Sequence, residues 1–448
     1  RYMLTASLRA DGSSRLNDKW CYFPSTAAAW NIKQEDFLKD INAIDQLKLR
    51  IGYGSVGNQA VATYRIYSKM SPTRNADGTT SYTVDRPRAN NLKWERNNQF
   101  NMGLDLGFLK NRLTVTADWY NKLSKDILLE LAQPSHMGYS SLLMNSGEIK
   151  NTGIEITVGA DPIIGKRFNW HTDITLTHNK GIYNKIPTPS RRQQQSGSYA
   201  NTLFYMIEKE KLGTFWGYTF DGIWQEDEVN AAFVDADGNI SGKTNGQVYK
   251  VKAGNTKLVD VNKDGKYNIS DQNIIGCGQP TFNWGWNNIF NYKDFDLSFF
   301  MVGFHGFDIY NATDQMGYNT VSGQNMSLIS NKPDLLDRWT PTNTNTNIPG
   351  FIKGGSENKV HTTRFVEDGS FVKVKSITLG YTLPLSLCKS LEINNLRVYA
   401  SIQNLFHITN YSGMDPEATL GGNPLVQGVD WASYPNTHNY LIGLNFSF

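Results

Sequence analysis

Apolar and polar residues alternate along the last nine positions of the chain, Tyr440–Phe448. One parity holds Tyr440, Ile442, Leu444, Phe446 and Phe448, and the other holds Leu441, Gly443, Asn445 and Ser447. A repeat of two residues is the period of a β-strand, so this stretch predicts a strand with one strongly apolar, aromatic-ended face. Such a strand at the end of a chain is typical of a bacterial outer-membrane β-barrel, whose strands face lipid on one side.

The same period recurs in pairs of segments joined by short turns. In the clearest pair, Asn97–Leu106 leads through a turn at Leu109–Arg112 into Leu113–Tyr120. Three further pairs surround the connections Ile164–Arg167, Tyr292–Asp294 and Pro384–Asn394, and the first residues, Arg1–Leu8, also alternate. In total the pattern predicts about twelve strands, and single-chain bacterial barrels have an even number.

Long polar segments rich in Gly, Asn, Ser, Thr and Pro separate these pairs. They are Ser55–Asn91, Leu129–Gly147, Tyr183–Gln279, Asp308–His361 and His407–Thr437. Compact soluble domains seldom carry several loops longer than about 12–15 residues. Outer-membrane barrels have long extracellular loops and short periplasmic turns. The sequence therefore predicts an all-β chain, a transmembrane antiparallel β-barrel, with an extracellular loop insertion at about residues 184–280.

One connection on the short-turn side, Asn31–Asp45, is longer than the others. Its apolar residues Phe37, Leu38, Ile41 and Ile44 have helical spacing. A soluble β-sandwich or propeller would also produce alternating strands. Neither would explain the alternation of short and long connections, and the chain has no repeat of fixed period.

Composition changes this interpretation little. Apolar residues make up 39% of the 448 residues, mean hydropathy is −0.45, and no stretch reaches the roughly 18–20 apolar residues of a membrane-spanning helix. A barrel tolerates such polarity because alternate residues face water. The net charge of +3 does not indicate a nucleic-acid partner. Cys21, Cys277 and Cys388 suggest neither a disulfide framework nor a zinc site.

Several segments together resemble the SusC/RagA-type family of TonB-dependent outer-membrane transporters, and they occur in the order of that family along essentially the whole chain. The matching segments are Leu8–Arg15, Tyr22–Ser25 with Ala29–Trp30, Leu49–Gln59, Leu92–Glu95, Asn151–Glu155, Gly217–Gln225, Asp260–Lys266, Ile377–Pro384, Gln403–Phe406 and the terminal strand. Each segment alone would be a weak match, but the ordered series is specific.

The resemblance implies a barrel of about 22 strands with a plugged lumen, of which this chain would be the carboxyl-terminal part. Because the first residues already alternate, with no signal peptide before them, we expect the signal peptide, plug and early strands to lie upstream. The family implies the bacterial outer membrane, crossed many times by strands. Its implied partners are a SusD-like surface lipoprotein lid, TonB, outer-membrane lipid and a second copy of the two-protein complex in a homodimer.

The sharpest chemical motif is Asp260–Asp271, which has the oxygen-ligand spacing of an EF-hand-like calcium loop. The predicted ligands are Asp260, Asn262, Asp264, Lys266 through its carbonyl, and Asp271. Gly265 would permit the sharp turn, but Asp replaces the usual Glu at position twelve. A turn held by side-chain-to-backbone hydrogen bonds is the alternative. Asp235–Asn239 is a shorter relative, predicted to be a plain turn.

Five aromatic residues close to this loop in the sequence are candidates for a glycan-binding platform, because aromatic faces stack on sugar rings. They are Trp216, Tyr218, Trp224, Trp284 and Trp286. Loop packing and an aromatic girdle at the membrane interface explain the same residues. The carboxylates Asp118, Glu155 and Asp173 are expected to line a wet lumen. Paired carboxylates can indicate glycoside hydrolysis, but no second catalytic feature accompanies them, so we predict no enzyme.

The sequence thus predicts the wall and outer vestibule of a TonB-dependent importer for a nutrient oligomer, glycan or peptide. Phe299, Leu379, Ile442 and Phe446 are expected to face lipid, where a charge costs roughly 2–4 kcal/mol at mid-membrane. The alternatives are a soluble extracellular calcium-dependent glycan-binding β-protein and a passive porin.

Overall fold

The computed structural model describes residues 1–139, 141–187, 192–193, 203–318, 336–350, 360–390, 393–420, 423 and 425–447. Its dominant feature is one antiparallel sheet of twelve strands, here called the strand wall. In chain order and spatial order the strands are β1 (Tyr2–Gly12), β2 (Trp20–Asn31), β3 (Ile44–Asn58), β6 (Glu95–Phe108), β7 (Leu113–Lys125), β10 (Glu148–Ile164), β11 (Phe168–Lys185), β20 (Phe282–Tyr292), β21 (Phe295–His305), β24 (Phe371–Thr382), β25 (Asn395–Thr409) and β27 (Asn439–Ser447). The predicted all-β chain with about twelve strands is confirmed, and β1 and β27 are the two edges of this sheet.

Residues of one parity give the strand wall a continuous apolar face. One row of directly opposed residues runs through Leu49, Leu104, Ala117, Ile156, Leu176 and Trp284. Phe299, Leu379, Ile442 and Phe446 lie on the same face. The exposed fraction of Ile442 is 86% and that of Leu379 is 52%, so other parts of this chain do not cover them. The alternate residues form a polar face.

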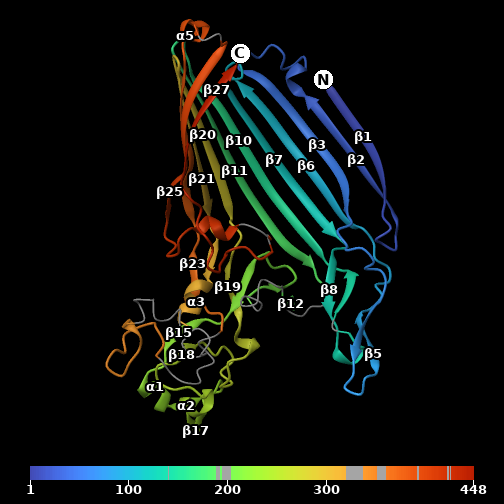
Figure 1. The fold of residues 1–448 in the computed structure, drawn as a ribbon, viewed down its shortest axis with the longest axis vertical. Helices are drawn as coiled ribbons and strands as arrows, with labels where there is room; N and C mark the ends of the chain where they lie inside the picture. Colours follow the sequence, from blue (N-terminus) through green and yellow to red (C-terminus); the bar gives the residue numbers. More distant parts are fainter. Residues whose placement is uncertain are drawn as a thin grey trace.

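The connections β2–β3, β6–β7, β10–β11, β20–β21 and β24–β25 and both termini lie at one end of the strand wall (Figure 1). In the turn between β6 and β7, Leu109, Lys110 and Asn111 all have positive φ, at 56°, 61° and 59°. Asp45 Oδ2 accepts hydrogen bonds from the backbone N–H groups of Lys110 at 2.5 Å and Asn111 at 3.1 Å. These bonds offset the conformational cost of left-handed backbone. The connection from β24 to β25 contains α5 (Leu385–Ser390).

The connection between β2 and β3 does not form the α-helix that its spacing suggested. It has only the 3₁₀-helix η1 (Ile32–Gln34), followed by turns, and Ile44 already belongs to β3. Lys33 Nζ donates to the carbonyl oxygens of Leu38, Lys39 and Ile41, which holds the turns together. Phe37 and Ile41 are 68% and 43% exposed, so these two apolar side chains are poorly packed, and so short an isolated helix is marginal in water.

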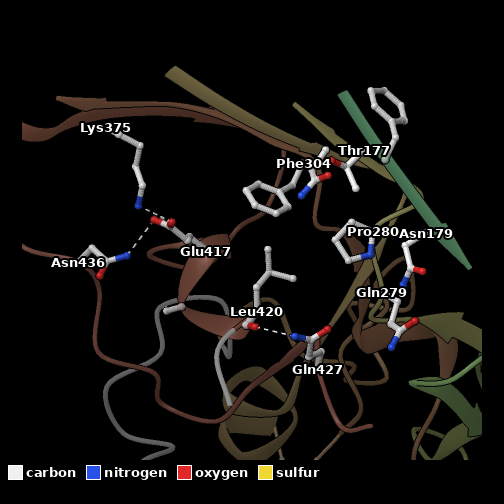
Figure 2. Close-up of a pocket in the computed structure, with 13 residues that line it drawn as sticks. Thr177, Asn179, Gln279, Pro280, Phe304, Lys375, Glu417, Leu420, Gln427 and Asn436 are labelled. Atoms are coloured by element: carbon white, nitrogen blue, oxygen red, sulfur yellow. Dashed lines mark hydrogen bonds and ion pairs between the residues drawn. The ribbon is translucent and has the colours of Figure 1, made fainter. Parts of the chain in front are cut away.

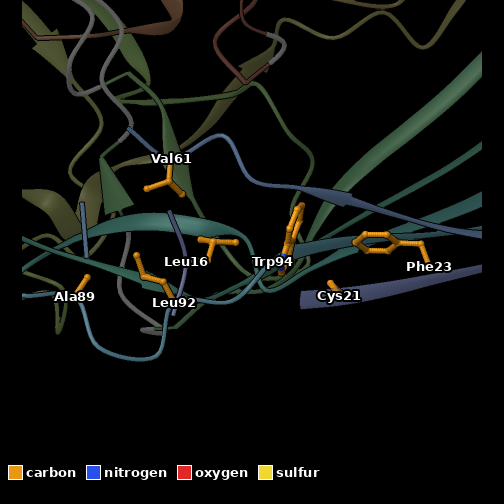
Figure 3. Packing of buried hydrophobic residues seen from close by; sticks show 7 residues of the cluster. All are labelled: Leu16, Cys21, Phe23, Val61, Ala89, Leu92 and Trp94. Atoms are coloured by element: carbon orange, nitrogen blue, oxygen red, sulfur yellow. The ribbon is translucent and has the colours of Figure 1, made fainter. Parts of the chain in front are cut away.

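The long connections emerge at the opposite end of the strand wall, as predicted (Figure 1). The first of them contains the hairpin β4 (Lys69–Arg74) and β5 (Thr80–Arg86). The second contains β8 (Leu128–Ala132), η2 (Ser135–Met137) and β9 (Ser141–Asn145). A small core joins the bases of the first strands and the first long connection there. It consists of Leu16, Cys21, Phe23, Val61, Ala89, Leu92 and Trp94 (Figure 3).

The last three long connections fold together into what we call the loop cap, residues 203–281, 306–318, 336–350, 360–370 and 410–437 where described. Its elements are β13 (Tyr205–Met206), which pairs with β12 (Arg192–Gln193), β14 (Thr214–Gly217), β15 (Phe220–Ile223), α1 (Glu226–Asn230), β16 (Ala232–Val234), β17 (Ile240–Thr244), α2 (Asn245–Tyr249), β18 (Thr256–Leu258), η3 (Ile269–Asp271), β19 (Asn273–Cys277), β22 (Asp308–Asn311), α3 (Ala312–Tyr318), η6 (Thr363–Phe365), β23 (Val366–Asp368), η7 (Pro416–Leu420) and β26 (Val429–Asp430). In the described ranges, no helix is long and apolar enough to cross a membrane.

The loop cap has a hydrophobic core of its own. Leu203, Phe204, Phe215, Tyr310, Ala312 and Phe365 form it, and Phe215 and Tyr310 are fully buried. The three-stranded sheet β23-β22-β26 joins the last two long connections by backbone hydrogen bonds. Because aromatic residues of separate connections share one core, the cap is a packed unit at one end of the strand wall.

Candidate functional site

The predicted calcium loop begins at Asp260, which the structure places at the edge of an aromatic cluster. Asp260 Oδ2 accepts hydrogen bonds from the Tyr249 hydroxyl and from the Gly265 backbone N–H, both at 2.8 Å. Gly265 has φ of 77°, so the glycine permits the sharp turn. Asp260 Oδ1 is buried and accepts no hydrogen bond from the described residues. A buried carboxylate oxygen without a donor fits a cation ligand.

The other end of the loop is closed by Asp271, which is fully buried. Its Oδ1 accepts from the backbone N–H of Val261 at 3.0 Å, and its Oδ2 accepts from that of Asn268 at 2.9 Å. Asp271 therefore makes the side-chain-to-backbone hydrogen bonds expected of a plain turn, which is the alternative to a calcium loop. In the described part of the chain, no group of three or more His, Cys, Asp or Glu residues is arranged to hold a metal.

Between these ends, the remaining predicted ligands are exposed and bond to one another. Asp264 Oδ1 accepts from the Lys266 backbone N–H at 2.8 Å, and Asp264 Oδ2 lies 3.2 Å from Asn262 Nδ2. The side-chain oxygens of Asn262 and Asp264 thus accept hydrogen bonds within the loop, and Asp271 anchors the end of the loop. Occupation of the loop stays a prediction.

A cavity of about 460 Å³ adjoins the loop on its aromatic side. Tyr249 lies at the centre of its lining, with ring centroids 5.6 Å from Trp224, 5.7 Å from Phe233 and 5.0 Å from Tyr267. Burial and the neighbouring Asp260 raise the pKa of Tyr249, so its hydroxyl stays protonated and donates. Lys257 Nζ lies 5.3 Å from the Trp224 ring centre.

The five predicted platform residues do not meet in one place. Trp216, Tyr218 and Trp224 belong to the loop cap, where Tyr218 and Trp224 are buried. Trp284 and Trp286 lie on the apolar face of β20 in the strand wall. Trp286 packs edge-on against Phe299 at 5.4 Å. A ligand-binding role for them stays a prediction.

The polar face of the strand wall carries the predicted carboxylates. Asp118 accepts from Arg50 at 3.1 Å, and Arg50 also makes two hydrogen bonds of 2.9 Å to Asp105. Glu155 lies directly opposite Asp118 in the β7–β10 pairing. On β11, Asp173 Oδ2 is 3.0 Å from His171 Nε2. Arg50 thus pairs with carboxylates of two other strands, whereas His171 and Asp173 are neighbours on the same strand.

A second cavity, of about 650 Å³, lies between the polar face of the strand wall and loop-cap residues 417, 418, 420, 427 and 436. Its lining includes Thr177, Asn179, Asn283, Phe304, Lys375 and Glu417, and we call it the mouth pocket. Figure 2 shows Lys375 and Asn436 both bonded to Glu417 on one side of this pocket. Sequence analysis missed it.

A buried ionic cluster stands behind the mouth pocket. Lys373 is 2% exposed, and its Nζ bonds to Asp415 Oδ2 at 3.0 Å and to Glu417 Oε2 at 2.7 Å. Glu417 also pairs with Lys375. One weak sequence feature accompanies the cluster: two lysines spaced by two on β24, and two carboxylates with the same spacing in the loop after β25.

The chain has clear relatives among known proteins. The family model described as "TonB dependent receptor-like, beta-barrel" matches residues 1–405. TonB-dependent receptor P3 of Formosa agariphila is 33% identical over 462 residues, covering 100% of this chain and 44% of that protein. TonB-dependent receptor SusC of Bacteroides thetaiotaomicron is 29% identical over 470 residues, with coverage of 100% and 42%. The chain thus spans less than half the length of these relatives.

Solved structures give the same fold. The RagAB peptide importer in its closed-closed state matches with a TM-score of 0.79 at 23% identity, covering 100% of this chain and 46% of the matched chain. The expected resemblance to SusC/RagA-type proteins is therefore confirmed for sequence and fold. Given the twelve-stranded wall, its two-faced strands and these matches, the chain belongs to the TonB-dependent receptor-like β-barrel family.

Proposed function

We propose that this chain forms the carboxyl-terminal wall and outer vestibule of a transporter that imports a nutrient oligomer across the bacterial outer membrane in a TonB-dependent manner. The observation that carries this proposal is the strand wall itself. Its apolar face carries exposed side chains from one edge of the sheet to the other, such as Leu4 at 79%, Met102 at 46%, Leu176 at 44% and Ile442 at 86%. Its polar face carries charges and amides. Hydrocarbon on one side and water on the other satisfy both faces.

The loop cap suits an import role because it covers one end of the strand wall only. A barrel too narrow or too plugged to pass a large nutrient freely needs an energy input to open. The expected plug and TonB contact would belong to the parts of the protein outside this chain. Glycan and peptide are both candidate cargoes: one solved relative is named a peptide importer, and that name applies to that protein.

We further propose that the loop cap contacts a SusD-like surface lipoprotein. Apolar side chains that reach from the cap into solvent support this, namely Ile240 at 76%, Val261 at 59% and Ile269 at 56% exposure. Co-purification of the full-length protein with a lipoprotein, lost on replacing all three by Ser, would test the contact.

Uptake in cells tests the import function. A strain with the full-length gene should accumulate a labelled oligomer, and deletion of TonB or a protonophore should abolish accumulation. Uptake that persists without TonB, together with steady channel conductance of the purified protein, would identify a passive porin instead. Detergent-free solubility of the native protein would identify the soluble glycan-binding alternative.

We propose, finally, that the Asp260 loop binds calcium. Asp260, Asn262 and Asp264 would supply side-chain oxygens and Lys266 its carbonyl, while Asp271 holds the loop closed. The unpartnered Asp260 Oδ1 supports this proposal. Calorimetry on the full-length transporter should show heat of calcium binding that Asp264→Ala removes. Asp237→Ala, in the nearby turn where Asp235 Oδ1 accepts from the Asp237 and Asn239 N–H groups, is the matched control. Equal heats for wild type and Asp264→Ala would refute it.

A further inference from the structure

The mouth pocket lies where an imported molecule would meet the strand wall first. Thr177 and Asn179 come from the second half of β11, Asn283 from the start of β20 and Phe304 from the end of β21. The facing side consists of loop-cap residues 417, 418, 420, 427 and 436, including Glu417. Figure 2 shows Phe304, Leu420 and Pro280 converging on the same space.

The pocket is built from buried contacts and does not depend on a ligand for its shape. Lys373 holds Asp415 and Glu417 against β24. Asn436 donates from its backbone N–H to Asp415 at 3.1 Å and from its amide to Glu417 at 3.0 Å. Burial acts to raise the pKa of Glu417, but the ion pairs with Lys373 and Lys375 outweigh it and lower that pKa. Glu417 is therefore ionised, and its negative charge is balanced by Lys373 and Lys375.

The charges around the pocket cancel. Two lysines, Lys373 and Lys375, face two carboxylates, Asp415 and Glu417, and all four are engaged with one another. An anionic ligand would find no uncompensated cation, and a cationic ligand no free carboxylate. Because taking an unpaired charge out of water is costly, this lining disfavours both.

The groups left free in the pocket are neutral. The side chains of Thr177 and Asn283 make no hydrogen bond to another described residue, and both can donate and accept. Phe304 and Pro280 add apolar surface beside them. Paired donors and acceptors next to an apolar surface match a pyranose ring, which has hydroxyl groups around its edge and C–H groups on its faces.

The mouth pocket is less suited to an extended peptide. Peptides commonly bind by adding a strand to a free sheet edge, where main-chain groups are unpaired. At the pocket, β11, β20 and β21 each have a paired neighbour on both sides. At the pocket, these three strands therefore offer side-chain groups but no free main-chain edge.

We propose that the mouth pocket binds an uncharged sugar unit of the imported oligomer, so that this transporter selects neutral glycans. The proposal rests on the proposed import function and adds the substrate class. It assigns Asn283 and Thr177 as residues that contact the sugar hydroxyl groups and determine specificity.

Direct binding to the full-length transporter in detergent tests the proposal. The probes are neutral hexasaccharides of α-glucan, β-glucan, mannan and xylan, the hexamer of polygalacturonate, and a peptide pool of similar length. We expect a neutral hexasaccharide to bind more tightly than the galacturonate or the peptides. Asn283→Leu should weaken that binding about tenfold by removing one polar contact and leaving sugar hydroxyls unpaired.

Asn287 is the matched control, because it lies on the same face of β20 four residues further from the loop cap and outside the pocket lining. Asn287→Leu should leave binding within about twofold of wild type. Asn283→Lys should increase affinity for the galacturonate hexamer about tenfold or more, since it adds an uncompensated cation. Asn287→Lys should do so far less, because it lies about 13 Å away along the strand, beyond the screening length of about 8 Å.

Tighter binding of galacturonate or peptide to the wild-type protein would overturn the proposal. Equal weakening of binding by Asn283→Leu and Asn287→Leu would also overturn it. The proposal would likewise fail if the purified transporter bound none of the neutral hexasaccharides while cells that carry it still showed TonB-dependent uptake. Thr177→Val, which changes one hydroxyl to a methyl group, provides a second variant should Asn283→Leu fail to fold, and it should also weaken binding. Sugar binding without TonB-dependent uptake would contradict the import function alone.

Discussion

The strand wall and the loop cap use apolar residues in opposite ways. In the wall, Leu4 and Ile442 are 79% and 86% exposed. In the cap, Phe215 and Tyr310 are fully buried with other aromatic residues. The cap thus completes its own core, as water-soluble domains do. The exposed apolar side chains of the wall need an apolar environment outside the protein, and in this family that environment is the lipid of the outer membrane.

Charges show the same contrast. On the wall they lie on the polar face and pair across neighbouring strands, as Arg50 does with Asp105 and Asp118. Where wall and cap meet, Lys373 of β24 is buried against Asp415 and Glu417. Each region should therefore respond to a different perturbation, and Lys373 should couple the two regions.

The largest effect should come from the cap core. Phe215→Ala removes a fully buried ring that lies 5.5 Å from Phe204 and 6.2 Å from Tyr310, and should destabilise the cap by about 3–5 kcal/mol. Hydrogen exchange should rise in the cap and stay unchanged in the wall strands. Ile240→Ala, at a 76% exposed position of the same region, should have little effect. Loss of wall protection in Phe215→Ala would contradict the independence of the two regions.

Breaking the coupling should have an effect of similar size. Lys373→Met leaves Asp415 and Glu417 buried without their shared cation, which should cost about 3–5 kcal/mol. Exchange should increase at the amides of η7 and of the 430–437 segment. The double variant Lys373→Met/Asp415→Asn restores part of the charge balance and should lose less than the single variant. A double variant that is less stable than the single one would show that the ion pair is not the coupling element.

Features of the fold that depend on neighbouring residues could be predicted from the sequence, whereas contacts between residues far apart in the chain could not. The wall strands were predictable because a two-residue period is local, and alternate exposure to two media preserves it from Leu113 to Phe446. The turn between β6 and β7 was predictable from the interruption of that period. The Asn31–Asp45 connection was misjudged because helical spacing without a surface to bury it does not make a helix.

Contacts within the cap could not be predicted in this way. The parallel pairing of β22 with β26 joins Tyr310 to Val429, far apart in the chain, and no local pattern encodes it. The same applies to Lys373 and Asp415, separated by 42 residues. Proximity in sequence was misleading for Trp224 and Trp284, which belong to the cap and to the apolar face of the wall.

Arginine substitution at two exposed apolar positions compares the media outside the two regions. Leu444 on the wall is 61% exposed and Ile240 in the cap is 76% exposed. Leu444→Arg should cost about 2–4 kcal/mol because the charge enters hydrocarbon, whereas Ile240→Arg should stay within about 0.5 kcal/mol. Heat-modifiable migration of the full-length protein from outer membranes should reveal impaired assembly for Leu444→Arg only. Normal folding of Leu444→Arg would mean that this face does not contact lipid.

The smallest predicted effect is that of mild acid, which should destabilise the cap but not the wall. His361 is 7% exposed in the cap, and its Nδ1 lies 3.0 Å from the Tyr310 hydroxyl. Burial lowers the pKa of His361 to about 4, whereas an unfolded histidine has a pKa near 6.5. Between these values the unfolded state binds the extra proton, so the stability of the cap falls as pH falls below about 6.5 and levels off near pH 4.

At pH 5 the loss should be about 2 kcal/mol, which is about 1.5 pH units at 1.36 kcal/mol per unit. Hydrogen exchange at pH 7 and pH 5, corrected for intrinsic rates, should show lost protection around Tyr310 and Phe365 but not in β10 or β11. His361→Gln removes the titrating group and should make cap protection independent of pH in this window, at some cost in stability at pH 7. A pH response that survives this substitution would place the acid-sensitive group elsewhere, and an equal response of β10 would show that acid does not separate the cap from the wall.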